Sequence, residues 1–293
     1  MINIRNRLNV IRTLLANESK ESLTYAALEC RLTLELICYE RLLISYDYIS
    51  HDDLRKWQPK DVVHQVIEEA NEHAASTFTI SVSPTPVEKG KEPESKEDYE
   101  RLEYVPIGTQ VGFDYNQIGK LWNALSNIAL HIQIPKDKSS SLSAYAESES
   151  LKKKINETID VLDALEKGNL LSSGFGPEYS FECETCHTKL KRKINCLRDG
   201  LTISCMLPSC LESYEIHVQG NEILHSRRLT QTRCNKCKSP VQVPAKQIEK
   251  LRLGQRIELN CDSCEEPLVI ELVPCIRSLG TEAPASNDKV DIP

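Results

Sequence analysis

The sequence is poor in glycine, which accounts for 11 of its 293 residues, about half the usual share. A loop-rich all-β fold is therefore not expected for the whole chain. The sequence also lacks an excess of positive charge, because 36 Lys and Arg residues stand against 43 Asp and Glu residues. The net charge of −7 excludes a generic basic nucleic-acid coat protein. Apolar types still make up 40% of the residues, which is enough for a folded core.

A hydrophobic run long enough to cross a membrane is also missing. The most apolar stretch, residues 23–46, is interrupted by five charged residues: Glu29, Arg31, Glu35, Glu40 and Arg41. The start, residues 1–7, is not followed by the apolar core of an export signal. We therefore expect a cytoplasmic protein without a membrane partner. In that reducing compartment, clustered cysteines bind metals more often than they form disulfides.

Familiar catalytic signatures are absent too. The sequence contains no Walker loop, no GxSxG elbow and no HExxH zinc-protease motif. Enzyme activity is therefore uncertain, and a non-enzymatic role is favoured.

The cysteines divide the chain into two parts. Of twelve cysteines, Cys30 and Cys38 lie in the N-terminal half and the other ten lie between Cys183 and Cys275. A turn-rich stretch at 172–177 separates the two parts. The domains predicted from this division are a helical bundle at 1–172, cysteine modules at 177–229 and 230–280, and a disordered tail at 281–293.

The first part has helical periodicity. Ile4, Leu8, Ile11 and Leu15 share one helical face. A second helix, over about 22–46, is apolar on nearly every side, which indicates a central, buried position. Further helices are expected from Pro59 onward, over about 114–131 and over about 147–167. The segment 82–103 is rich in Pro, Lys and Glu and is predicted to be a mobile loop.

The second part alternates short strand-like runs with cysteine pairs. Two cysteines separated by two or four residues can place their thiolates at one tetrahedral site, and a second such pair completes the site. The predicted ligands of two structural Zn²⁺ ions are Cys183, Cys186, Cys205 and Cys210, and then Cys234, Cys237, Cys261 and Cys264. An offset of 51 residues relates Cys183, Cys186 and Cys210 to Cys234, Cys237 and Cys261, which indicates an imperfect internal repeat.

Alternatives to this metal assignment remain at this stage. Cys196 is a rival to Cys205 as a ligand. A redox-active CxxC site would need a βαβ unit, which the sequence does not indicate. A catalytic zinc usually keeps an open coordination position, whereas each module offers four cysteines.

A basic cluster in the modules is a candidate nucleic-acid contact. Its residues are Lys189, Lys191, Arg192, Lys193, Arg227 and Arg228. Residues 189, 191 and 193 would share one face of a strand. Only three aromatic residues occur in the modules, so a base-stacking platform is poorly supplied. A solvated hairpin face and a protein-docking surface are the alternatives.

The helical part contains a second candidate site. Arg31 and Glu35 are spaced i, i+4 on one helix, and His131 ends the expected helix at 114–131. Together they would form a polar pocket for acid–base chemistry. Otherwise Arg31 and Glu35 form a buried ion pair, and His131 interacts with the end of its helix.

The runs from Tyr25 to Glu35 and from Leu121 to His131 resemble the helical pattern of HEPN-type domains. The resemblance covers about residues 20–168. It implies a bundle of four or five helices from prokaryotic defence, toxin or RNA-processing proteins, some of them metal-independent RNases and others binding domains. Active members carry an Arg and a His on one helix, with four to six residues between them. Here the positions that should hold the Arg before His131 are Ala124, Leu125 and Ser126.

We therefore expect an α+β multidomain protein, with an N-terminal helical bundle followed by two β-rich zinc-ribbon modules. Its expected role is that of a zinc-binding bacterial adaptor or nucleic-acid-binding protein, in which the bundle mediates self-association and the ribbons engage nucleic acid or a partner protein. The alternative is a diverged HEPN-like ribonuclease that uses Arg31, Glu35 and His131.

Overall fold

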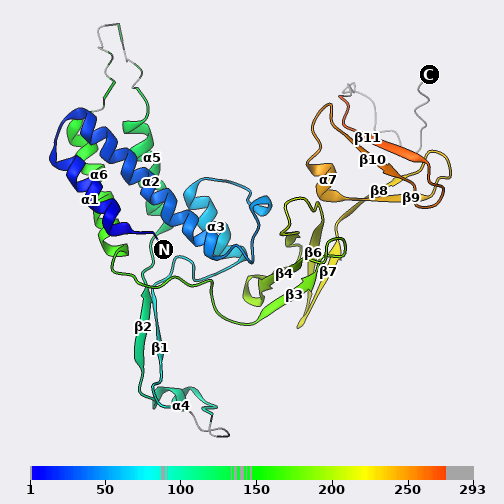
Figure 1. Cartoon of the computed structure of the whole chain (residues 1–293), viewed down its shortest axis with the longest axis horizontal. Helices are drawn as coiled ribbons and strands as arrows, with labels where there is room; N and C mark the ends of the chain where they lie inside the picture. Colours follow the sequence, from blue (N-terminus) through cyan, green and yellow to red (C-terminus); the bar gives the residue numbers. More distant parts are fainter. Residues whose placement is uncertain are drawn as a thin grey trace. The chain divides into compact units, whose positions relative to one another are not determined.

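The computed structural model describes residues 2–86, 90, 92–132, 134, 137–138, 142, 144–145 and 147–274 (Figure 1). The chain forms two compact units. Unit 1 comprises residues 1–210 and 214–226, and unit 2 comprises residues 211–213 and 227–293. Mixed α and β structure, with a mainly helical N-terminal part followed by a region of small antiparallel sheets, confirms the predicted fold class at this level. The predicted tail at 281–293 and Cys275 lie outside the described residues.

Five helices of unit 1 agree with the five predicted from periodicity. They are α1 (Ile4–Ala16), α2 (Lys20–Ile44), α3 (Pro59–Glu69), α5 (Tyr115–Ala129) and α6 (Ser148–Leu165). A short 3-10 helix, η1 (His51–Asp53), lies between α2 and α3. None of the described helices combines the length and hydrophobicity that a membrane crossing requires.

Helix α2 is the central helix, as its nearly continuous apolar surface predicted. Its N-terminus is capped by Ser19, whose side chain accepts a hydrogen bond from the Ser22 amide. It contacts α1, α3, α5 and α6. Cys30 and Cys38 are fully buried on it, and burial raises the pKa of both thiols to about 12. These two cysteines are therefore core residues and not nucleophiles.

A β-hairpin follows α3 and was not predicted. Strand β1 (Phe78–Val82) pairs antiparallel with β2 (Val105–Gln110), and α4 (Lys96–Glu100) lies on the connection between them (Figure 1). The segment predicted as a loop at 82–103 therefore contains a helix. Ser95 and Asp98 explain this helix, because they form a capping box at its start.

Unit 1 also contains nearly all of the first cysteine module, which we define as strands β3–β7; only Ser213 and Arg227, at the ends of two strands, belong to unit 2. β3 (Glu178–Glu182) pairs with β4 (Lys189–Lys193), and the 3-10 helix η2 (Ile194–Cys196) follows. β5 (Thr202–Ser204), β6 (Ser213–Gln219) and β7 (Glu222–Arg227) form a three-stranded sheet in the order β5-β6-β7. The predicted boundary at 172–177 thus lies inside a compact unit.

The second cysteine module, in unit 2, comprises strands β8–β11 and helix α7. β8 (Leu229–Arg233) pairs with β9 (Pro240–Pro244), α7 (Ala245–Glu249) follows, and β10 (Arg256–Asn260) pairs with β11 (Pro267–Glu271). Its buried cluster consists of Cys234, Val241, Val243 and Cys261. Such a small core needs an additional stabilising element.

Candidate metal centres

Four cysteines of the first module converge on one point. Cys183 and Cys186 occupy the turn between β3 and β4, and Cys205 and Cys210 lie between β5 and β6. The Sγ atoms of Cys183 and Cys210 are 3.7 Å apart, and those of Cys186 and Cys205 are 3.4 Å apart. All four sulfurs lie within 4.8 Å of one another.

The second module repeats this arrangement. Its Sγ–Sγ distances are 3.7 Å between Cys234 and Cys264 and 3.6 Å between Cys237 and Cys261. These four sulfurs also lie within 4.8 Å of one another. Both sets are the ones predicted from spacing, so each module can hold one metal ion.

The strands show how the two modules correspond. Cys205 directly follows β5, and Cys261 directly follows β10. Cys205 therefore corresponds to Cys261, and Cys210 corresponds to Cys264. The 51-residue offset relates structurally equivalent cysteines only in the first pair of each module. In the second pair it matches Cys210 to Cys261, which are not equivalent.

Three of the four cysteine turns share one backbone geometry. The carbonyl of Cys183 accepts from the His187 amide, and the Cys183 amide donates to the Thr188 carbonyl, at 2.9 and 3.0 Å. The turns that begin at Cys234 and Cys261 have the equivalent bonds. In each turn the residue after the second cysteine has a left-handed φ: 58° at His187, 62° at Lys238 and 58° at Glu265.

This left-handed conformation is uncommon for residues other than glycine and costs about 1–2 kcal/mol. Its recurrence at one position of three turns shows that the turn itself requires it. A turn this tight directs both thiols and nearby amides toward one point, as a tetrahedral cysteine site needs. The turn at Cys205 and Cys210 differs because four residues separate its cysteines.

The spacing of the sulfurs fits zinc. A zinc–sulfur bond of about 2.3 Å gives a sulfur–sulfur edge of about 3.8 Å in a regular tetrahedron, close to the observed distances. A disulfide would need about 2.05 Å, and all eight residues are free cysteines. Soft thiolate ligands and fourfold geometry favour zinc over harder cations.

Hydrogen bonds prepare one thiol in each cluster for metal binding. Burial disfavours the Cys186 thiolate, but hydrogen bonds with the side chain and backbone of Thr188 outweigh it and lower its pKa to about 6. Hydrogen bonds with the side chain and backbone of Ser239 likewise lower the pKa of Cys237 to about 6. A metal-binding thiolate is therefore accessible near neutral pH in both modules. Thr188 and Ser239 each lie two residues after the second cysteine of their pair. This Cys-x-x-Cys-x-Thr/Ser pattern could have identified the two hydroxyls, but the cysteine spacing did not include them.

Tyr214 adds an outer contact to the first cluster. Its hydroxyl lies 3.4 Å from the Sγ atom of Cys183 and accepts a hydrogen bond from the Glu184 amide at 2.8 Å. Such outer hydrogen bonds orient metal ligands. Tyr214 is fully buried, and the sequence had identified it only as one of three aromatic residues.

His225 completes an aromatic cluster beside Tyr214. Its ring stacks on Phe181 with a centroid distance of 3.9 Å, and its Nδ1 atom lies 2.7 Å from the Tyr179 hydroxyl. Burial lowers the pKa of His225 from 6.5. Folding therefore favours the neutral imidazole.

We expect this histidine to make stability depend on pH. The unfolded chain binds the His225 proton at a higher pH than the folded chain, so stability falls as the pH drops below 6.5 toward the folded pKa. Urea unfolding of the wild type and His225→Gln over about pH 5.5–7.5 tests this. The variant should lose less stability on acidification, and equal losses in the two proteins would contradict the prediction.

Cys196, the predicted rival of Cys205, is not part of either group of four. It lies in η2 and is buried. Burial raises the pKa of its thiol, so it is a core residue of the first module.

The predicted basic face is largely occupied by internal ion pairs. Arg192 is 1% exposed and bonds Asp53, and Lys193 is buried and bonds Glu178 at 2.7 Å. Neither side chain has surface left for a phosphate, which corrects the expectation for these two. The burial of Arg192 and Lys193 could not be predicted from the sequence, because four of the five residues of β4 are charged.

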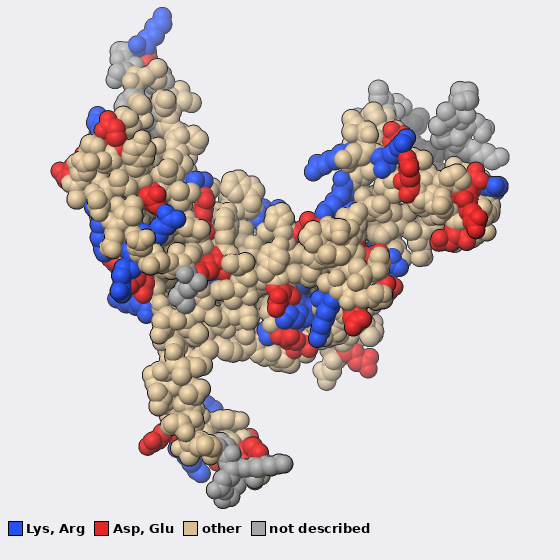
Figure 2. Space-filling view, in the orientation of Figure 1, with Lys and Arg blue, Asp and Glu red and all other residues tan. Residues whose placement is uncertain are grey.

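The other four residues of that face are more exposed. Lys191 bonds Asp47 at 3.1 Å, Arg227 bonds Glu212 at 2.6 Å and Arg228 bonds Glu249 at 2.8 Å. Lys189 is exposed. Figure 2 shows basic and acidic side chains intermingled on the face drawn. The basic residues therefore do not act as one continuous positive stripe.

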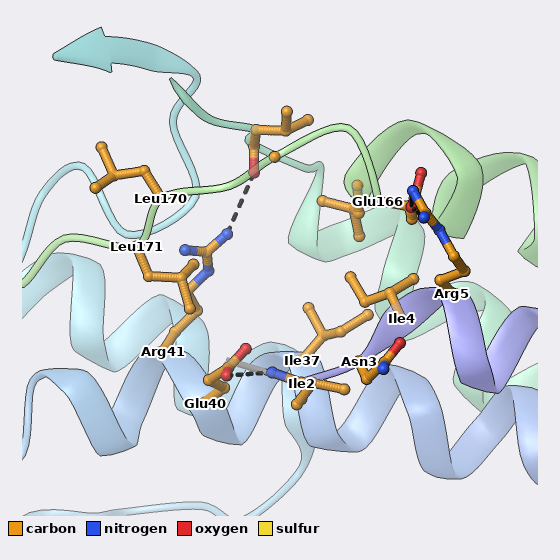
Figure 3. A pocket seen from close by; sticks show the side chains of 13 residues that line it. Ile2, Asn3, Ile4, Arg5, Ile37, Glu40, Arg41, Glu166, Leu170 and Leu171 are labelled. Carbon is orange, nitrogen blue, oxygen red and sulfur yellow. Dashed lines mark hydrogen bonds and ion pairs between the residues drawn. The ribbon is translucent and has the colours of Figure 1, made fainter. Parts of the chain in front are cut away.

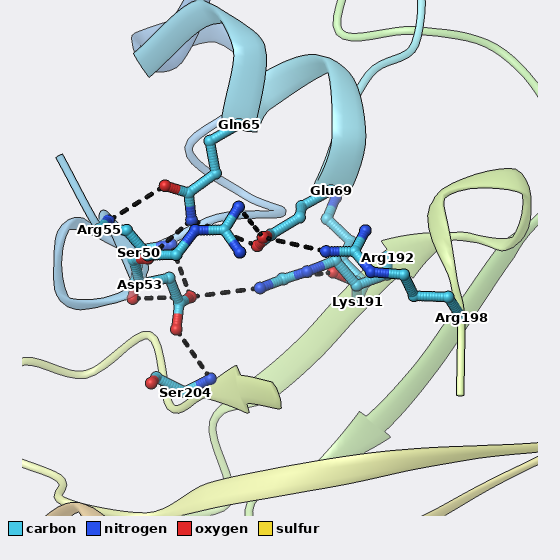
Figure 4. A network of polar contacts seen from close by, with 9 residues as sticks. All are labelled: Ser50, Asp53, Arg55, Gln65, Glu69, Lys191, Arg192, Arg198 and Ser204. Atoms are coloured by element: carbon cyan, nitrogen blue, oxygen red, sulfur yellow. Dashed lines mark hydrogen bonds and ion pairs between the residues drawn. The ribbon is translucent and has the colours of Figure 1, made fainter. Parts of the chain in front are cut away.

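A buried network joins the first module to the helical part of unit 1 (Figure 4). The Asp53 carboxylate accepts hydrogen bonds from Arg192 Nη2 at 3.2 Å and from the Ser204 amide at 3.0 Å. Ser50 holds the same carboxylate through its amide and hydroxyl. Asp53 thus contacts the residue that directly precedes the metal-binding candidate Cys205.

Glu69 extends this network. Its carboxylate lies 2.9 Å from the Arg55 guanidinium and 3.7 Å from that of Arg198, and Gln65 donates to it at 3.4 Å. Burial raises the pKa of Glu69. Neither Asp53 nor Glu69 was predicted, because their importance comes from a tertiary contact that local sequence does not encode.

The second predicted site is only partly assembled. Arg31 bonds Glu35 at 2.9 Å and Ser126 at 2.9 Å, and its guanidinium lies 4.7 Å from the Trp122 ring centroid. Trp122 Nε1 donates to Glu35 at 2.7 Å. His131 is exposed beyond the end of α5, and no hydrogen bond or ion pair among the described residues links it to Arg31 or Glu35. The arrangement is that of a satisfied ion pair between α2 and α5.

Comparisons of the chain with protein-family models, curated proteins and solved structures found no match.

Proposed function

We propose that this chain is an adaptor protein in which two zinc ions per chain stabilise two zinc-ribbon modules. The observation that carries the proposal is the convergence of four cysteine sulfurs in each module. With four thiolate ligands, neither ion has an open position for substrate or water, which is typical of structural zinc. The small core of the second module would then depend on its metal for much of its folding energy.

The zinc content of the full chain tests this first step. Protein purified without chelators should contain close to two zinc ions per chain, measured by elemental analysis. Protein that carries no zinc under those conditions, and takes up none when zinc is supplied, would overturn the proposal.

We further propose that the adaptor binds a partner protein through its second module. Four large apolar side chains are exposed there: Leu253, Val269, Leu272 and Val273. Strand β11 pairs with β10 in a sheet of two strands, so one edge of it is open within the described residues. Exposed apolar residues next to an open strand edge are typical of a protein-docking surface. The setting implied by the HEPN resemblance, prokaryotic defence or RNA processing, stays a prediction.

Nucleic acid is the competing partner, and salt dependence separates the two. Contact with phosphates weakens steeply as salt rises. We expect neither single-stranded RNA nor duplex DNA to bind the chain in this manner. If RNA or DNA binds with a steep salt dependence, and Lys189→Glu and Lys191→Glu weaken that binding, the partner is nucleic acid and not a protein.

The docking surface has a matched control. Val269→Asp should abolish binding of a purified partner, whereas Val82→Asp, at an exposed valine in unit 1, should leave it unchanged. Equal binding by both variants would contradict docking through the second module.

A further inference from the structure

A pocket in the helical part contains an arginine donor that meets no partner. The pocket has a volume of about 260 Å³ and lies beside α2, near the end of α6 (Figure 3). Arg41, in the last turn of α2, is only 6% exposed. Its Nη1 atom is buried without a hydrogen-bond partner.

The other contacts of Arg41 leave Nη1 without an acceptor at the edge of the pocket, on the side of Leu171. Its Nη2 atom donates to the Val111 carbonyl at 3.2 Å, and its guanidinium lies 5.5 Å from the Phe113 ring centroid. Figure 3 shows the guanidinium rising from α2 into the space beside Leu171. A buried donor without an acceptor is costly, and a buried charge is more costly still.

The charge of Glu40 favours the charged form of Arg41, but no hydrogen bond from Arg41 Nη1 to a neighbouring carboxylate is formed. Glu40 accepts a hydrogen bond from the Ile2 amide at 2.7 Å, and Glu166 pairs with Arg5 at 2.6 Å. Burial lowers the pKa of Arg41 to about 10, so its guanidinium is still charged at neutral pH. An oxyanion that reaches Nη1 would supply the acceptor that this donor lacks.

The remaining walls specify the rest of the ligand. Ile2, Ile4, Ile37, Leu165 and Leu171 contribute apolar side chains to the pocket. A phosphate or sulfate ion would leave these walls without contact, whereas a hydrocarbon chain would cover them. A cavity of about 150 Å³ already holds benzene, so the larger volume here accommodates a body of about six carbons together with a carboxylate.

We propose that this pocket binds a small organic carboxylate, with its anionic group on Arg41 and its hydrocarbon body against the isoleucine and leucine walls. This binding site uses none of the cysteines and does not depend on the zinc-adaptor proposal.

The test uses hexanoate as the probe and the full chain as the receptor. Amide NMR signals near Arg41, Val111 and Leu171 should shift on titration with hexanoate, with a dissociation constant of about 1 mM or tighter. Hexanamide, which has the same body without the charge, should bind at least about tenfold more weakly. Inorganic phosphate should not compete.

Two variants keep the proposal open to refutation. Arg41→Met, which removes the charged donor, should weaken hexanoate binding by about tenfold or more. Leu171→Trp keeps Arg41 and fills the pocket, so it should also prevent binding while the urea midpoint stays unchanged. Absence of hexanoate binding to the wild type, equal binding to Leu171→Trp, or binding of phosphate in place of hexanoate would each overturn the proposal.

Discussion

Replacing Cys205 with serine is expected to remove one of two zinc ions per chain and to unfold the first cysteine module. Structural zinc contributes about 10–16 kcal/mol of apparent binding free energy in zinc-finger peptides. A module of short strands around Cys183, Leu190, Tyr214 and a few further residues cannot replace that contribution. Elemental analysis of zinc and the backbone amide NMR spectrum of the variant measure the two effects.

Cys196→Ser is the matched control for this prediction. Cys196 is a buried cysteine of the same module but lies outside the group of four sulfurs. The control should keep both zinc ions and lose only the modest stability that a core substitution costs, about 1–3 kcal/mol. Loss of zinc from Cys196→Ser, with retention in Cys205→Ser, would reverse the ligand assignment.

Replacing Asp53 with alanine is expected to destabilise unit 1 by about 3–5 kcal/mol. The substitution removes the ion-pair partner of the Arg192 guanidinium, which is 1% exposed, and leaves Glu69 as the remaining carboxylate that favours its charge. It also deprives the Ser204 amide of its acceptor. Urea unfolding followed by the fluorescence of Trp57 and Trp122 measures the change, because both tryptophans lie in the helical part of unit 1.

Asp47→Asn provides the comparison for Asp53→Ala. The side chain of Asp47 is 76% exposed and pairs with Lys191 from the same strand as Arg192. A surface pair of this kind contributes about 0–1 kcal/mol. The double variant Asp53→Ala/Arg192→Leu should recover part of the loss, because it removes the unpaired charge. If Asp53→Ala proves no more destabilising than Asp47→Asn, the Asp53–Arg192 pair is not a structural clamp.

The five long helices and the two groups of four cysteines could be predicted from the sequence because their signals are local. The stripe of Ile4, Leu8 and Ile11 specifies a helix face within three turns, and the spacing of Cys234 and Cys237 specifies a turn of fixed geometry. Strands β8 and β9 were not predicted. Leu229–Arg233 has only one apolar residue, and Pro240–Pro244 contains two prolines.

Features that depend on tertiary contacts could not be read in this way. Arg192 and Lys193 look like surface charges in sequence, and their burial depends on acidic residues far away along the chain, such as Asp53. The same reasoning explains Arg41. In the sequence it is one of five charged residues in the apolar stretch 23–46. The pocket beside it is completed by Val111 and by residues within 165–171, which are distant along the chain.

The position of Ser204 has a consequence for how the proposed zinc ion and the helices of unit 1 influence each other. Ser204 bonds Asp53 through its amide, and the next residue is Cys205. Residues that hold Asp53 in place therefore also help to position Cys205, a proposed zinc ligand. By thermodynamic linkage, the factor by which an ordered helical part tightens zinc binding at this centre equals the factor by which zinc favours the ordered helical part. We therefore expect metal affinity at the first module to depend on the whole unit and not on its four sulfurs alone.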